Sequence, residues 1–134
     1  MSQSDERPRA TPAERFEGTE HVYDLSASIA QLRREPRPMH GGHRQVTLYK
    51  HPTATMSVFD FESGSGLPDH KADGFVTIHV LRGRMTVTTP TNEHDLSAGK
   101  VLVLAPGVRH GLLAKDATEM LLIVNLTGRA NDGK

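Results

Sequence analysis

Two histidines stand beside glycine-marked apolar stretches, His70 within GLPDHKADGFVTIHVLRG and His110 at the end of GKVLVLAPGVRH. Imidazole is the commonest metal ligand in proteins and the usual proton shuttle near neutral pH. The chain has eight histidines and no cysteine, which excludes disulfides, thiol catalysis and cysteine metal sites. The chemistry open to this pair is therefore metal binding, acid–base catalysis or polar contact with a ligand.

Short strand patterns surround both histidines. Apolar residues recur at every second position from Gln45 onward, which is the period of a strand with one buried face. Glycine- and proline-containing turns separate these stretches at short intervals, and this indicates an all-β barrel or sandwich. The predicted strands comprise 46–48, 54–62, 75–81, 84–89, 101–104, 110–114 and 119–126.

The clearest predicted hairpin joins the strands at 75–81 and 84–89. Its two-residue turn ends in Gly83, and glycine tolerates the positive φ that such turns need. In the first of these strands, alternation places His79 on the face opposite to its apolar neighbours Ile78 and Val80. We therefore expect His79 to point away from the interior, toward a possible subunit contact.

One helix is predicted at 25–35, because Leu25, Ile29 and Leu32 form a single apolar stripe. Asp24 can cap its first turn, and a proline follows its end. So narrow a stripe favours packing against a sheet or a second subunit. Together with the strand at 54–62, where Val58 lies on one face and Phe59 on the other, it predicts a homodimer.

Length and apolar patterning predict one domain over 20–127, with flexible polar tails at 1–19 and 128–134. Sixteen basic and sixteen acidic side chains give a net charge of zero, so no basic surface for nucleic acid is expected. No apolar run is long enough to cross a bilayer, and no secretory leader is recognised. We therefore expect a cytoplasmic protein with neither nucleic-acid nor membrane partners.

Glycines, strand lengths and both histidines fall together in a recognisable order. Gly66 precedes His70, the next strand ends before Gly83, and the motifs LSAG, VLVL and APG lead to His110. In this order the chain resembles small single-domain proteins of the cupin family over about 45–126. The resemblance implies a double-stranded β-helix, or jelly-roll barrel.

The resemblance also implies a metal site made by His-x-His, a glutamate and a later histidine. His70 and His110 match the first and last of these ligands. Ala72 stands at the second histidine position and Val76 at the glutamate position, so two donors are replaced by apolar side chains. A site with two histidines would bind a divalent metal weakly unless other groups joined it.

The first functional hypothesis is a metal-free cupin that binds a small, partly hydrophobic organic molecule. Apolar walls with a few placed polar groups are typical of ligand pockets. His70 or His110 would supply the polar contacts, or act as general base or acid if the protein is an enzyme, which the sequence leaves open. The predicted lining comprises His70, Ala72, Val76, Ile78, Met85, Val87, Leu104 and His110.

The second hypothesis is a metal-dependent cupin enzyme of the dioxygenase or isomerase type. His70 and His110 would hold Fe, Mn, Ni or Zn, with a third ligand from Asp69, Asp73 or the N-terminal loop. In that loop, His40 and His43 bracket two glycines; we interpret them as polar loop residues rather than as ligands. In a third hypothesis, the barrel is a structural module for oligomerisation.

Overall fold

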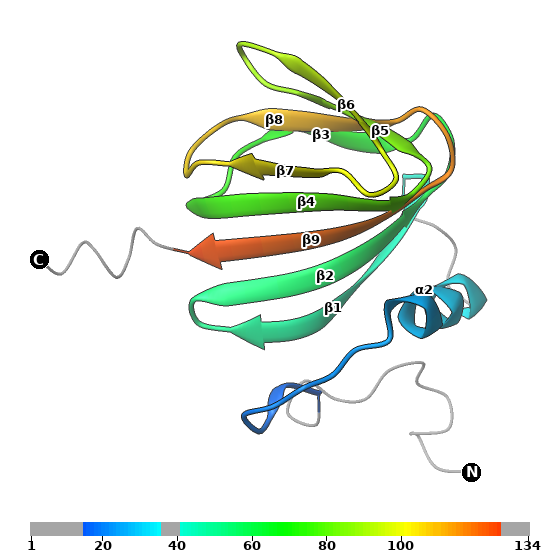
Figure 1. Ribbon diagram of the computed structural model, residues 1–134, viewed down its shortest axis with the longest axis vertical. Coiled ribbons are helices and arrows are strands. Elements are labelled where there is room, and N and C mark those ends of the chain that lie inside the picture. Colours follow the sequence, from blue (N-terminus) through cyan, green and yellow to red (C-terminus); the bar gives the residue numbers. More distant parts are fainter. Residues whose placement is uncertain (1–14, 36–40, 127–134) are drawn as a thin grey trace, which may run out of the picture.

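Two antiparallel β-sheets face each other in the computed structural model, which describes residues 15–35 and 41–126 (Figure 1). One sheet has the strand order β1-β2-β9-β4-β7 and the other has the order β3-β8-β5-β6. This arrangement confirms the predicted all-β jelly-roll barrel. The elements are α2 (Leu25–Arg34), β1 (His43–His51), β2 (Ala54–Phe61), β3 (Gly66–His70), β4 (Gly74–Arg82), β5 (Arg84–Thr88), β6 (Glu93–Ser97), β7 (Val101–Leu104), β8 (His110–Ala114) and β9 (Thr118–Leu126).

The main core lies between the two sheets. Strand β4 alternates as predicted, because Ile78 and Val80 are fully buried while His79 is half-buried and faces the other way. Met85 and Val87 reach the same interior from β5 of the opposite sheet, and neither side chain is exposed. The remaining buried members of this core are Phe59, Phe61, Val76, Leu96, Leu104, Leu112, Ala114 and Met120.

The predicted hairpin between β4 and β5 is wrong. Strand β4 pairs with β7 and β9, whereas β5 pairs with β6 and β8, so the chain changes sheets between them. Gly83 makes this crossing at a φ of +91°. The hydroxyl of Thr118 on β9 accepts from the Arg84 amide at 3.1 Å and lies 3.0 Å from the Arg84 carbonyl, to which it can donate. These contacts fasten the corner where the two sheets meet.

Two strands of the smaller sheet, β3 and β6, carry too little apolar pattern to be predicted. Strand β3 contains Pro68, which has no backbone N–H for a sheet ladder. It is tolerated because β3 is an edge strand with an irregular register between Leu67 and His70. Strand β6 has a single buried residue, Leu96, which packs against the core.

The helix is confirmed, and it ends one residue earlier than predicted, at Arg34. The Asp24 carboxylate caps it by accepting from the Ala27 amide at 3.0 Å. Ile29 and Leu32 are buried, and Ile29 packs on the outer face of the larger sheet in a second apolar cluster. Figure 1 shows α2 outside β1, so this sheet is covered on both faces at that end.

An ion-pair network also joins the helix to the sheet. Arg33 Nη2 donates to Asp60 Oδ1 at 3.1 Å and to Glu119 Oε2 at 2.6 Å. Arg82 adds a second cation 3.6 Å from the same Glu119 oxygen. The hydrogen bond to Asp60 raises the pKa of the Arg33 guanidinium, and burial acts in the opposite direction. The network therefore holds α2 in place with charge as well as with apolar contact.

The predicted tail at 128–134 and most of the tail at 1–19 lie outside the described residues. Within residues 15–19, which the structure describes, Arg15 and Phe16 contact the rest of the chain. The Phe16 ring lies edge-on to Tyr49 at 6.2 Å, and Arg15 lines a cavity beside the helix. None of the described helices is long and apolar enough to span a bilayer.

Replacing Gly83 by alanine should destabilise the protein far more than replacing Gly99 by alanine. Both glycines have a φ of +91°, so both substitutions carry the same backbone strain, about 1–2 kcal/mol. A Cβ at Gly83 would also clash with the Ala117 carbonyl and with the Thr118 backbone, whereas a Cβ at Gly99 meets no atom within 4 Å. We expect about 3 kcal/mol or more for Gly83→Ala in urea unfolding. Equal losses for the two variants would contradict the sheet crossing described here.

Candidate functional site

His70 and His110 are direct partners across the β3–β8 strand pair. Their ring centroids lie 4.4 Å apart, with the ring planes inclined by 55°. His110 is 2% exposed, whereas His70 is exposed to solvent. The sequence predicted both as site residues, and the structure brings them into contact.

Backbone carbonyls orient both rings. His70 Nδ1 lies 2.8 Å from the carbonyl oxygen of Pro68, and His110 Nδ1 lies 3.0 Å from that of Val108. A carbonyl oxygen can only accept, so each Nδ1 must carry the proton in these hydrogen bonds. In the neutral rings both Nε2 atoms therefore hold free lone pairs, which can accept a hydrogen bond, take a proton or bind a metal.

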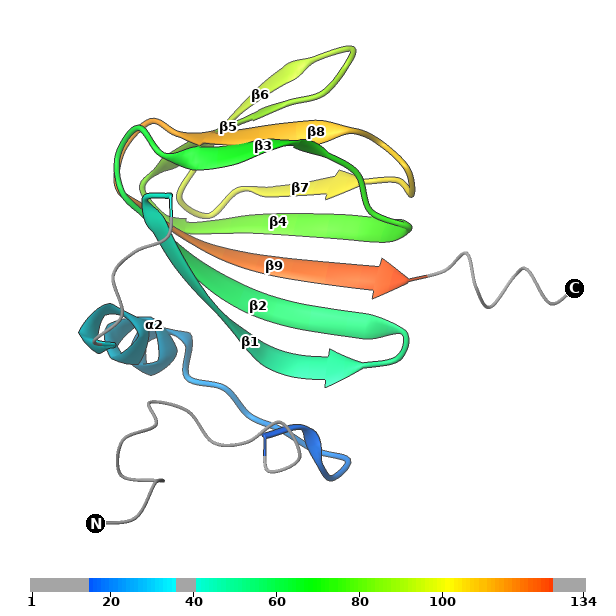
Figure 2. The ribbon, with the colours of Figure 1, turned by 180° about the vertical axis from the view of Figure 1, so that it is seen from behind.

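The pair lies at one end of the space between the sheets. Strand β3 ends at His70, only four residues before β4 begins at Gly74. Gly74 pairs with Leu126, the last residue of β9, so β9 ends at the same place. Figure 2 shows β3 running to the side of the molecule where the C-terminal end of β9 emerges. We call this end the barrel mouth. The half-buried apolar side chains that pack against the core from this half include Leu67, Ala72, Val108, Leu122 and Val124.

The deeper residues of the predicted pocket are part of the packed core. Ile78, Met85 and Val87 have no exposed surface, and Val76 and Leu104 are 3% and 6% exposed. Ala72 is half-buried at the mouth, where its carbonyl accepts from the Gly107 amide at 3.0 Å. The pocket with its full predicted lining stays a prediction.

The carboxylates suggested as a third metal ligand are exposed. Asp69 Oδ2 lies 3.4 Å from Arg109 Nε, so this carboxylate already faces a cation. Asp73 is exposed on the loop before β4. In the part of the chain that the structure describes, no three histidine or acidic side chains come together as a metal-binding group.

The other histidines do not extend the pair. His43 begins β1 opposite Phe61, at the far end of the barrel from the mouth, and its ring lies 5.4 Å from that of Phe61. It is thus a strand residue with a half-buried ring, not the polar loop residue expected from the sequence. His40 lies outside the described residues. His79 is on the outer face of β4, as predicted.

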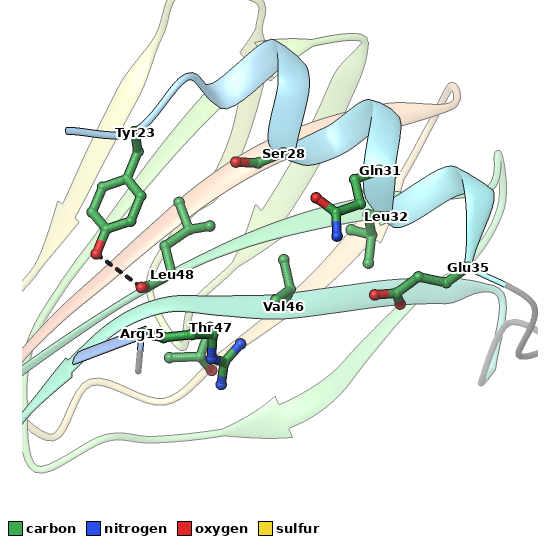
Figure 3. Close-up of a pocket in the computed structure, with 9 residues that line it drawn as sticks. All are labelled: Arg15, Tyr23, Ser28, Gln31, Leu32, Glu35, Val46, Thr47 and Leu48. Atoms are coloured by element: carbon green, nitrogen blue, oxygen red, sulfur yellow. Dashed lines mark hydrogen bonds between the residues drawn. The ribbon is translucent and has the colours of Figure 1, made fainter. Parts of the chain in front are cut away.

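A second site escaped the sequence reasoning: a cavity of about 360 Å³ beside α2 and β1 (Figure 3). Its only sequence signal is the pair Arg15–Phe16, a cation and an aromatic residue within a segment that otherwise reads as a polar tail. The cavity is lined by Arg15, Tyr23, Ser28, Gln31, Leu32, Glu35, Val46, Thr47 and Leu48.

Solved structures with the same fold come from several organisms. A conserved protein of unknown function from Streptococcus pyogenes is 23% identical, with a TM-score of 0.67 over 84% of this chain and 94% of that one. A cupin superfamily protein from Desulfitobacterium hafniense is 17% identical, with a TM-score of 0.66 over 84% and 96% of the two chains. KdgF from a Halomonas species is 16% identical, with a TM-score of 0.61 over 71% and 90%. At these identities the likeness concerns the fold alone.

No curated protein matches the chain. The model of the cupin domain family, Cupin_2, matches residues 57–125, which is more than half of the 134 residues and includes both histidines of the mouth. The chain therefore belongs to the Cupin_2 family of cupin domains.

Proposed function

We propose that this cupin binds a small organic molecule at the barrel mouth through His70 and His110, without a resident metal. The observation that carries the proposal is the contact of the two imidazoles, 4.4 Å apart, with both Nδ1 atoms held by backbone carbonyls. Two lone pairs at Nε2 beside half-buried apolar side chains are what a ligand with one polar and one hydrophobic part requires.

The two rings have different environments and hence different roles. His110 is 2% exposed and sits where a bound ligand would be shielded from water, so a hydrogen bond to its Nε2 would be stronger than one made in solvent. His70 is exposed and can exchange protons with solvent. The pair could thus pass a proton between a ligand hydroxyl and water, although binding alone needs only the hydrogen bonds.

The donor set does not favour a resident metal. Fe, Mn, Ni and Zn sites use three or more protein ligands, and here Ala72 and Val76 occupy the positions of two family ligands. Asp69 is turned toward Arg109. A metal-dependent enzyme stays the second candidate because the two Nε2 lone pairs could both face one ion. It requires a third donor beyond the groups described here.

The homodimer and the cytoplasmic location remain predictions. Several large apolar side chains are exposed on the outer face of β4 and β7, including Phe75 at 43%, Val101 at 52% and Val103 at 59%. A second copy of the chain is the partner that we expect there. A monomer mass in solution would contradict this prediction.

The neutral forms of His70 and His110 should both carry their proton on Nδ1. Each Nδ1–H donates to a backbone carbonyl two residues earlier in the chain, and this contact selects the tautomer. Long-range ¹H–¹⁵N NMR spectra of the imidazole rings, recorded well above the pKa of histidine, would measure it directly. A proton on Nε2 of His110 would contradict the assignment of this atom as an acceptor.

Binding at the mouth can be tested with a library of small fragments that pair a hydroxyl or ammonium group with an apolar body. Methyl NMR signals of Val108, Leu122 and Val124 would report binding. We expect bound fragments to shift these signals. In His70→Ala the affinity of these fragments should fall about fivefold, because the loss of one hydrogen bond costs about 1 kcal/mol. The matched control is His79→Ala, on the outer face, which should leave the affinities unchanged.

Two results would overturn the proposal. One is a library that moves none of the mouth methyl signals. The other is a set of hits whose affinity falls equally in the variants of His70 and His79. Added Zn²⁺ or Mn²⁺ separates this proposal from the metal-dependent enzyme. A site with only two histidines should lose the ion on dialysis, whereas a metal centre should keep it.

A further inference from the structure

The cavity between α2 and β1 has walls of mixed chemistry. Leu32, Val46 and Leu48 provide apolar surface, while Ser28 and Gln31 project polar groups from the helix (Figure 3). Its volume of about 360 Å³ lies within the range of small-molecule sites, roughly 300–1,000 Å³. The cavity is on the outside of the barrel, so it is separate from the mouth and from the two histidines there.

Arg15 brings to this cavity a cation with two unsatisfied nitrogen donors. Its Nε and Nη1 atoms are enclosed, and neither has a hydrogen-bond partner among the described residues. The guanidinium carbon lies 4.7 Å from the centroid of the Phe16 ring, a contact that positions the group but satisfies none of its N–H donors. Enclosed donors without acceptors are costly, so a ligand that accepted from them would be held by more than apolar contact.

Tyr23 closes the cavity on one side. Its hydroxyl donates to the Leu48 carbonyl at 2.9 Å, beside the irregularity in β1 between Thr47 and Tyr49. Burial, followed by the proximity of Tyr49, raises the pKa of the Tyr23 hydroxyl, so this group stays neutral. Because its one proton is already donated to the Leu48 carbonyl, the Tyr23 hydroxyl has no proton left to donate to a ligand.

We propose that this cavity binds a small organic monocarboxylate, with Arg15 as its cationic anchor. The planar guanidinium presents parallel N–H donors that match the two oxygens of a carboxylate. The apolar walls suit a short aliphatic or aromatic body. Figure 3 shows the carboxylate of Glu35, at the end of α2, among the groups that line the same cavity.

The test uses benzoate as the probe and benzamide as its neutral match in shape. Amide NMR signals of Ser28, Gln31 and Leu48 in the ¹⁵N-labelled full chain would report binding at this cavity. We expect benzoate to bind about tenfold or more tightly than benzamide, because only the carboxylate forms charge-assisted hydrogen bonds with Arg15. In Arg15→Gln this preference should fall to within about twofold.

Arg34→Gln is the matched control, since it removes the same charge from an exposed position near the end of α2. It should keep the full preference for benzoate. Three outcomes would overturn the proposal: no signal change with benzoate, equal binding of benzoate and benzamide by the unmodified protein, or an unchanged preference in Arg15→Gln. Inorganic phosphate that binds at this cavity as tightly as benzoate would also contradict the proposal, because the site would then select charge alone.

Discussion

The apolar contact between the two sheets is the interaction on which the rest of this molecule depends. Ile78 and Met120 from the larger sheet meet Met85 and Val87 from the smaller one, and none of these side chains is exposed. Complete burial of such a side chain contributes about 1.5–3 kcal/mol relative to the exposed state. The contact fixes the position of the smaller sheet, and with it the β3–β8 pair that carries both histidines of the mouth.

The two ends of the barrel differ in which side chains and hydrogen bonds they contain. At one end the crossing at Gly83 is fastened by the fully buried hydroxyl of Thr118, which satisfies the polar backbone of Arg84. At the other end lie the two histidines, where the imidazole of His110 is enclosed while that of His70 is exposed to solvent. The crossing at Gly83 stabilises the fold, whereas the two histidines at the mouth are the groups that we propose a ligand would contact.

How much of this was predictable depends on whether the cause lies nearby in the sequence. Alternation along β4 was enough to place His79 outside, and the cap and stripe were enough to place α2. The hairpin at Gly83 was wrong because the same turn residues serve a hairpin or a sheet crossing, and only pairing with β9 decides between them. Strand β3 was missed because Pro68 argues against a strand unless its edge position is known.

The candidate site was also predicted only in part. The cupin motifs located His70 and His110, but their cross-strand register and the carbonyls that orient them come from the folded chain. The cavity at Arg15 was not predicted, since its walls come from three separate segments that meet only through tertiary packing.

The most direct test of the central claim is the metal content of the protein, purified without a histidine tag and measured per chain. With Ala72 and Val76 at the sequence positions of the other two family ligands, the two imidazoles should retain far less than one equivalent of Fe, Mn, Ni or Zn. Removing that trace with a chelator should leave the stability unchanged. Near-stoichiometric metal that disappears in the His70→Ala/His110→Ala double variant would contradict the account and establish the mouth as a metal centre.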